Sequence, residues 1–363
     1  MKALRIYAGP KAREHIAQHG LRPKDVAVVP GAAGGPKGLI LGLLDRFIFG
    51  DWLAQTTHPV HLVGASIGAW RMATACLADP VAGFARLEHD YIHQHYELQP
   101  GQKRPTAAFV SERFGESLKS FYGGKVGEVL NHPRYRLHIV TARGRHLLGR
   151  EHKLATPLGY LGAFLTNGVH RKAMGAWLER VVFSSQDAAL PFATADYRTR
   201  QIGLTEANFQ PALQASCSIP FVLRAVQNIP GAPPGAYWDG GITDYHLHLN
   251  YAADLAAEAG QGSLVLYPHF QKSVVPGWLD KGLKWRHKAT PFLDDMVVLA
   301  PSAEWVAGLP NGKLPDRSDF MRYGPDLQAR VKAWMAATSA SEQLADEWQA
   351  WLAKPDMDRV LPL

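Results

Sequence analysis

One short motif in this sequence has the residue types and the spacing of a serine nucleophile. It is the pentapeptide G-A-S-I-G at residues 64–68, which follows an apolar run at residues 60–63 and precedes apolar residues at helical spacing. A serine on a sharp strand-to-helix turn exposes its hydroxyl at the end of the sheet, where a substrate carbonyl can reach it. The flanking Gly64 and Gly68 permit the strained backbone and the close approach that such a turn needs. The motif therefore predicts that Ser66 is an acyl-transfer nucleophile.

A glycine-rich loop at residues 31–38 is a second candidate for chemistry. It does not fit the common phosphate-binding patterns, because Ala33 stands where G-x-G-x-x-G needs glycine and Gly38 stands where a P-loop needs serine or threonine. The backbone N–H groups of Gly34 and Gly35 could instead converge on an oxyanion, with Lys37 adding positive charge. The loop is thus interpreted as an oxyanion hole.

A third candidate is the turn Asp239-Gly240-Gly241, in which an acidic side chain precedes two glycines. Such a turn holds an aspartate on a loop, as a catalytic group is often held, although turns rich in Asp and Gly are also common for local reasons.

Taken in order, the three stretches resemble the patatin-like phospholipase family, and a fourth stretch at residues 212–220 is similar to the segment that precedes the aspartate of that family. The resemblance spans roughly residues 26–268. It implies a serine acyl hydrolase of lipid esters that needs no metal or cofactor and uses a Ser-Asp dyad. The residues that it implies are Ser66 as nucleophile, Asp239 as base, Gly34 and Gly35 as oxyanion donors, Lys37 as the basic residue of that loop, and Gly64, Gly68, Gly240 and Gly241 as supports of the elbow and the turn.

Two departures from the family pattern affect the site. Ala32-Ala33 stands where the family usually begins its glycine loop with Asp-Gly, which removes a side-chain anchor. Residues 245–247 replace an Asn-x-Pro segment that often follows the aspartate, so the acyl pocket is expected to have a different lining.

A Ser-Asp-His triad is the alternative within the hydrolases. His269 follows Asp239 in the chain and comes at the expected end of a strand, where α/β-hydrolases carry their histidine. With 16 histidines in the chain, one in this order has little weight.

Alternating polar residues at Asp244, His246 and His248 would share one face of a strand and could ligate a metal. No fourth ligand accompanies them, and the expectation is a polar edge or pocket lining without metal.

A protein that binds lipid or membrane without catalysis is the alternative from another class. On a helix, the apolar residues at 278–285 would gather on one side and Lys281, Lys284 and Lys288 mostly on the other, although Arg286 interrupts the apolar arc. An ordinary surface helix is therefore the expectation, and a peripheral contact of this segment with an anionic membrane stays open as the alternative.

The composition is that of a globular protein, with 363 residues, 47% hydrophobic and 20% charged. The net charge of +7 favours anionic partners, but the basic residues are scattered and no nucleic-acid motif is present, so nucleic acid is not expected as a partner. Neither a signal peptide nor a membrane-spanning run is visible. A cytoplasmic location, with peripheral membrane contact open, is the expectation; the oligomeric state cannot be inferred from the sequence.

The first eighty residues have the pattern of strand, glycine loop, helix, strand, elbow and helix, which is typical of a parallel sheet covered on both faces. Short apolar strands are predicted at residues 25–29, 60–63, 136–140, 180–184 and 263–267. The fold class is therefore α/β, with a mostly parallel central sheet between helices in three layers and a C-terminal helical extension.

The tail from about residue 324 has two amphipathic patterns, the second with a capping box at Ser339 and Glu342. These patterns predict a helical hairpin that packs on the sheet. The expected domains are an α/β hydrolase domain at residues 1–323 and a C-terminal helical extension at 324–363, packed on that domain.

Overall fold

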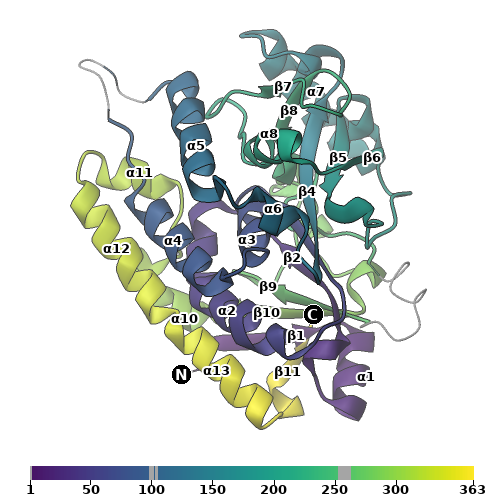
Figure 1. The fold of residues 1–363 in the computed structure, drawn as a ribbon, viewed down its shortest axis with the longest axis vertical. Coiled ribbons are helices and arrows are strands. Elements are labelled where there is room, and N and C mark those ends of the chain that lie inside the picture. Colours follow the sequence, from purple (N-terminus) through teal and green to yellow (C-terminus); the bar gives the residue numbers. More distant parts are fainter. Residues whose placement is uncertain (1, 98–101, 103–104, 252–262) are drawn as a thin grey trace.

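The computed structural model describes residues 2–97, 102, 105–251 and 263–363 (Figure 1). Within them a central sheet runs in the order β11-β1-β10-β9-β2-β3-β4-β5-β6, with β8 and then β7 branching from β4. The strands are β1 (Leu4–Ala8), β2 (Val26–Gly31), β3 (Val60–Ala65), β4 (Tyr135–Gly144), β5 (Leu178–Ser184), β6 (Thr199–Gly203), β7 (Val226–Gln227), β8 (Ala236–Asp239), β9 (Leu264–Pro268), β10 (Met296–Pro301) and β11 (Val360–Pro362).

Most neighbouring strands are parallel, which confirms the predicted sheet. The pairs β10–β9, β9–β2, β2–β3 and β3–β4 run parallel, and every residue of β2 and β9 is buried. All five predicted segments are strands. One orientation differs, because β5 was expected to be a parallel strand and pairs antiparallel with β4.

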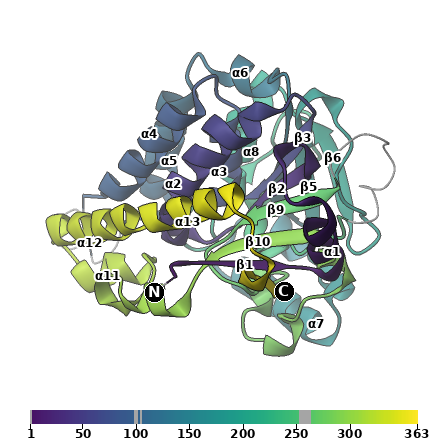
Figure 2. The ribbon, with the colours of Figure 1, turned by 90° about the horizontal axis from the view of Figure 1, so that it is seen from below.

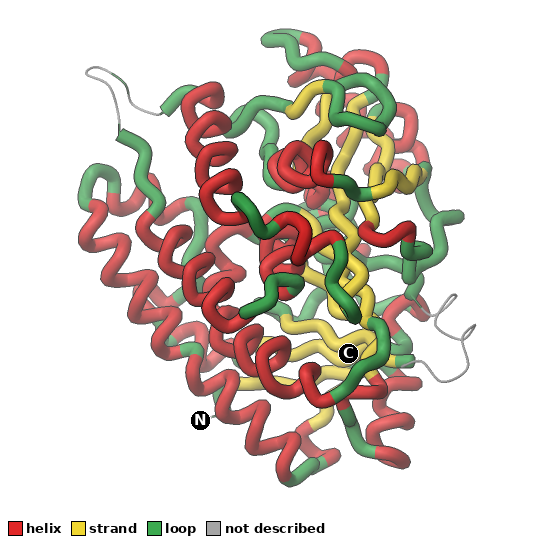
Figure 3. Tube along the Cα trace, in the orientation of Figure 1, coloured by secondary structure: helices red, strands yellow, loops and turns green. Residues whose placement is uncertain are grey.

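Helices cover both faces of the sheet, as predicted. Figure 2 shows α2, α3 and α13 on one side of the strands and α1 and α7 on the other, and Figure 3 shows the strands enclosed between these layers. The helices are α1 (Pro10–His19), α2 (Gly42–Phe47), α3 (Ile67–Ala75), α4 (Pro80–His93), α5 (Ala107–Tyr122), α6 (Val126–Leu130), α7 (Ala155–Val169), α8 (Glu206–Ser216), α10 (Ala303–Ala307), α11 (Ser318–Tyr323), α12 (Leu327–Ala340) and α13 (Glu342–Ala353).

The C-terminal tail contains the two predicted helices, but they do not form a hairpin. Both views show α12 and α13 nearly end to end, with their break at Ser341 (Figures 1 and 2). Ser339 lies inside α12 and does not open the second helix. After α13 the chain adds β11 to the sheet beside β1. The division at residue 323 stays a prediction.

Two further segments differ from the patterns read in the sequence. Residues 278–285 do not form a helix, because the chain makes two separate 3-10 turns, Trp278–Asp280 and Lys284–Arg286. Residues 244–248 do not form a strand either. Among the helices that the structure describes, none has the length and the apolar character needed to cross a bilayer.

Candidate active site

Ser66 occupies a strained turn between β3 and α3. Its backbone has φ 57° and ψ −130°, a conformation that costs a non-glycine residue about 1–3 kcal/mol. Gly68 makes the turn sterically possible, because a Cβ at this position would lie 1.8 Å from the carbonyl oxygen of Gly31. A Cβ at Gly64 would likewise lie 2.4 Å from the Cα of Ala69. The absence of a side chain at these two glycines therefore lets strand and helix approach closely.

The structure brings Ser66 and Asp239 together, with 2.7 Å between Oγ of the serine and Oδ2 of the aspartate. The sheet register accounts for this proximity. In the sheet Ala65 pairs with Val140 of β4, and the next β4 residue, Thr141, pairs with Asp239 at the end of β8. Two residues 173 positions apart thus arrive at the same edge of the sheet.

The Asp239 carboxylate is buried and held by two hydrogen bonds. Oδ1 accepts the backbone N–H of Gly241 at 2.7 Å, and Oδ2 accepts the hydroxyl of Ser66. Burial is the largest influence and raises the pKa of Asp239, while the Ser66 bond and the charge of Arg317 oppose the rise. Gly240 packs against β4, since a Cβ there would lie 2.1 Å from the carbonyl oxygen of Val140. The carboxylate is thus fixed and more basic than an ordinary aspartate.

The end of α8 and the residues that follow it orient both Ser66 and Asp239. Ser216 accepts the backbone N–H of Ser66 at 2.9 Å and donates its hydroxyl to the carbonyl of Val140 at 2.7 Å. Ser218 accepts the backbone N–H of Asp239 at 3.0 Å through its carbonyl. The sequence indicated this stretch only through its resemblance to the family, and it did not predict these hydrogen bonds.

The glycine loop lies beside the serine and is fixed by close packing. Gly34 has an extended φ of 170°, and a Cβ there would lie 2.5 Å from the ring of Phe270. Gly35 has φ 58°, in the left-handed region that favours glycine. Gly34 lines the same cavity as Ser66, whereas Gly35 lines a neighbouring hollow.

A cavity of about 300 Å³ opens above Ser66 and Asp239. Its lining residues are Ala33, Gly34, Lys37, Ser66, Ile219, Asp239, Gly241, Ile242, Tyr245, Trp278, Lys281, Asp316, Arg317 and Ser318. Two of its cations, Lys281 and Arg317, were not foreseen, because they lie beyond the family-like stretches and among scattered basic residues.

Three cations therefore face this cavity, namely Lys37, Lys281 and Arg317. The two carboxylates of the lining have other partners, since Asp239 bonds to Ser66 and Asp316 to Lys313. In the described part of the chain, none of the three cations forms an ion pair. Burial lowers the pKa of Lys37, and burial together with the charges of Arg317 and Lys37 lowers the pKa of Lys281 to about 8.

His269 lies apart from this arrangement. Its Nδ1 contacts the backbone of Gln271, and its ring packs against His246 and Phe270. Burial lowers its pKa to about 3. Among the described residues, no hydrogen bond links His269 to Ser66 or Asp239, so the geometry of a triad is not formed.

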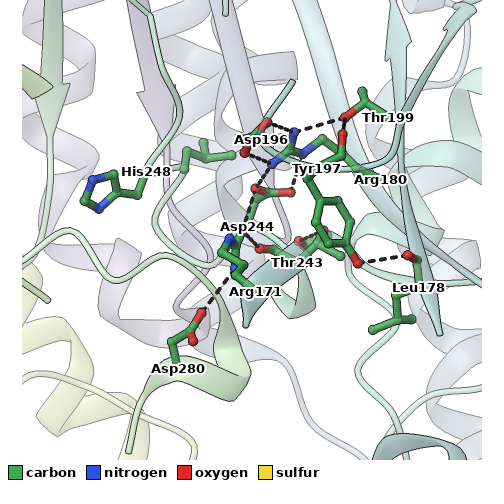
Figure 4. A network of polar contacts seen from close by, with 12 residues as sticks. Arg171, Leu178, Arg180, Asp196, Tyr197, Thr199, Thr243, Asp244, His248 and Asp280 are labelled. Carbon is green, nitrogen blue, oxygen red and sulfur yellow. Dashed lines mark hydrogen bonds and ion pairs between the residues drawn. The ribbon is translucent and has the colours of Figure 1, made fainter. Parts of the chain in front are cut away.

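The three alternating polar residues have separate structural partners. Asp244 lies 2.6 Å from the guanidinium of Arg180 in a buried network that also contains Arg171 (Figure 4). His246 bonds to the carbonyl of Ser273, and His248 bonds to Val274 and Thr290. The described residues contain no group of three side chains arranged to hold a metal.

Comparison with known proteins identifies one family. The model described as patatin-like phospholipase matches residues 32–247. No curated protein matches the chain. Among solved structures, VipD from Legionella pneumophila is 13% identical with a TM-score of 0.39, over 95% of this chain and 70% of the VipD chain.

Proposed function

Since this chain belongs to the patatin-like phospholipase family, a family of lipid acyl hydrolases, we propose that it cleaves carboxylic esters of lipids with a dyad of Ser66 and Asp239. The observation that supports the dyad most strongly is the 2.7 Å hydrogen bond between the two side chains at the base of a cavity. A nucleophile within hydrogen-bond reach of its base is the arrangement that covalent catalysis needs.

The reaction follows from these positions. Asp239 accepts the proton of Ser66 as Oγ attacks the ester carbonyl, and the backbone N–H groups of Gly34 and Gly35 receive the oxyanion, with Lys37 adding positive charge. Asp239 then gives its proton to the departing alcohol, which leaves an acyl-enzyme. In the second half Asp239 takes a proton from water, the hydroxide attacks the acyl carbon, and the proton returns to Ser66.

The raised pKa of Asp239 fits this role. A carboxylate of ordinary acidity, with a pKa near 4, is a weak base at neutral pH, and burial makes Asp239 more basic. The bond from Gly241 leaves Oδ2 directed at the serine.

The cations of the cavity support an ester that carries an anionic group. Lys37, Lys281 and Arg317 face the space above Ser66, and a phosphate or carboxylate on the substrate would offset their mutual repulsion. We therefore propose anionic lipids as preferred substrates. We also propose that the protein acts in the cytoplasm, with peripheral contact to anionic membrane.

The test combines covalent labelling with turnover. Purified wild type, Ser66→Ala, Asp239→Asn and His269→Ala are treated with an alkyl fluorophosphonate and assayed with a p-nitrophenyl ester. We expect labelling to be lost in Ser66→Ala, and turnover to fall by about 1000-fold or more in Ser66→Ala and Asp239→Asn. His269→Ala is the matched control and keeps its turnover. If turnover is lost in His269→Ala but retained in Asp239→Asn, the base is not Asp239 and the dyad is wrong. A wild type that is neither labelled nor able to hydrolyse the ester would favour a lipid-binding protein.

A further inference from the structure

Helix α7 exposes an apolar face. Thr156, Gly159, Tyr160, Ala163 and Asn167 form its buried face. The opposite face carries large apolar side chains that are exposed, and α7 contains no charged residue from Ala155 to Val169. A helix on the surface of a globular protein normally turns charged or polar residues outward. The outward face of α7 is therefore unusual.

Residues from two neighbouring segments extend this surface, which we name the α7 face. Its members are between 45% and 86% exposed: Leu147, Leu154, Leu158, Leu161, Phe164, Leu165, Val169, Phe221 and Val222. Phe221 is linked to the helix by a ring contact with Tyr160, whose centroid lies 6.0 Å away. Exposed apolar residues that gather in one patch mark an interaction surface, whereas scattered ones do not.

Basic and aromatic residues border the α7 face. His152 and Lys153 precede the helix and His170 and Lys172 follow it, all of them exposed, with Glu151 as an acidic neighbour. The segment with exposed Trp285, Lys284 and Lys288 adjoins the end of α7, because Arg286 bonds to Asn167 and to the carbonyl of Gly168. The border is thus mainly cationic and complements a negatively charged surface.

The α7 face and the cavity above Ser66 are linked through two chain segments. Ile219 lines the cavity, and Phe221 follows two residues later. Trp278 also lines it, and its 3-10 turn is tied to α7 by a 2.8 Å hydrogen bond from Asn167 to Asp280. A surface that binds to α7 therefore comes close to the cavity.

We propose that the α7 face docks the protein on an anionic lipid bilayer, with the helix lying in the membrane surface. The choice of a bilayer rests on the proposed function, because a lipid hydrolase must reach esters in a membrane. Leucine and phenylalanine side chains enter the boundary between headgroups and acyl chains, while the bordering lysines reach the phosphates. Trp285 fits the same interface, where tryptophan is enriched.

Vesicle flotation tests this proposal with the full chain. Vesicles of phosphatidylcholine, alone or mixed with phosphatidylglycerol, are mixed with wild type and with Leu161→Glu/Leu165→Glu. The control Val81→Glu/Met335→Glu adds the same charge at exposed apolar residues of α4 and α12. With anionic vesicles, we expect the fraction of protein that floats to be about tenfold lower for the α7 variant than for wild type. The control should float to the same extent as wild type. Wild type should bind mixed vesicles better than neutral ones, and salt should weaken the difference.

The outcomes separate docking from catalysis. Fluorophosphonate labelling and hydrolysis of a soluble p-nitrophenyl ester should be equal in all three proteins. If the chain has no active serine nucleophile, labelling is absent in every protein, while flotation still compares the surfaces. Equal flotation of wild type and the α7 variant, or no flotation of wild type, would overturn the docking proposal. A dimeric wild type that becomes monomeric in the α7 variant, without a change in flotation, would assign the face to a second copy of the chain.

Discussion

The backbone N–H of Ser66 is bonded to the hydroxyl of Ser216, which lies 150 residues further along the chain. The same hydroxyl donates to Val140, the β4 residue that pairs with Ala65. One small side chain therefore connects the elbow, the sheet and the end of α8. Since Ser216 bonds to the backbone of Ser66 and does not line the cavity, we regard it as a positioning residue.

Replacing Ser216 with alanine should slow catalysis without removing the nucleophile. The buried N–H of Ser66 would lose its acceptor, which costs about 1–3 kcal/mol in stability. We expect kcat to fall by about tenfold with KM little changed, and fluorophosphonate labelling to slow in parallel. The control is Ser218→Ala, because the hydroxyl of Ser218 bonds to the carbonyl of Gln214 and not to Ser66. Equal kinetics of Ser216→Ala and wild type would contradict the positioning role.

The acid limb of the pH profile should report Asp239. Its pKa is raised by burial, and the positive charge of Arg317 opposes that rise. Removal of Arg317 makes the carboxylate harder to ionise, so its pKa goes up. In Arg317→Ala, the acid limb of kcat/KM for a neutral p-nitrophenyl ester is therefore expected to move to higher pH. Arg322→Ala is the control in the adjacent helix, and an acid limb that stays in place in Arg317→Ala would argue against the assignment.

Anionic substrates should bind less well at alkaline pH. The pKa of Lys281 is about 8, so its charge is present below this pH and lost above it. For an anionic ester, KM should rise as pH passes through about 8, whereas KM for a neutral ester of equal chain length should not. Lys281→Met is expected to abolish this rise, and Lys284→Met, an exposed lysine outside the cavity lining, should retain it. A rise of the same size for both esters would show that the lysine charge is not responsible.

A methyl group at residue 68 should disrupt the elbow. The Cβ of Gly68→Ala would lie 1.8 Å from the backbone oxygen of Gly31. The nearest atoms all belong to the backbone, so no flexible side chain can move aside to make room. We expect a loss of about 3 kcal/mol or more in the free energy of unfolding, together with loss of labelling. Gly127→Ala has open space in α6 and should be neutral or slightly stabilising. Chemical denaturation of both variants provides the comparison.

The buried pair of Asp244 and Arg180 should stabilise the fold without contributing to the chemistry (Figure 4). Asp244→Ala leaves Arg180 buried with Asp196 as its one remaining acidic partner among the described residues, and it should cost about 3–5 kcal/mol, measured by denaturation. Burial raises the pKa of Asp244, but the charges of Arg180 and Arg171 and the hydrogen bonds of Arg180 outweigh burial and lower this pKa below its unfolded value. Its stabilisation is therefore complete above the unfolded pKa, about 4, and is lost as pH falls through the folded pKa. If kcat of the folded variant drops as far as that of Asp239→Asn, the network has a catalytic part.

Local patterns were sufficient for the elements around the elbow. The apolar runs before residues 31 and 64 and the glycines after them specify strands and tight turns through local conformation, so these elements could be predicted from the sequence. The antiparallel pairing of β4 with β5 and the addition of β11 depend on contacts between distant segments, and no local pattern encodes such contacts.

The cationic lining and the apolar helix show the same limit. Lys281 and Arg317 have no spacing that relates them to Ser66, since folding alone brings them to one cavity. The helix expected at residues 278–285, on which the alternative of a membrane-binding face was based, is not formed because the chain makes two turns there. Helix α7, in contrast, exposes leucines that a sequence pattern would assign to the core. Which face of such a helix is exposed is decided by the segments that pack against it.

The position of β1 in the sheet has a consequence for the order in which the protein folds during synthesis. This strand lies between β10 and β11, so both of its neighbours are synthesised long after β1 itself. Until residues 296–301 leave the ribosome, β1 has neither of its sheet partners. Strands that wait for distant partners fold slowly and are prone to pair wrongly in the meantime. The nucleophile elbow can assemble from consecutive segments. The half of the sheet that contains β1, β10 and β11 can form only after β10 has been synthesised.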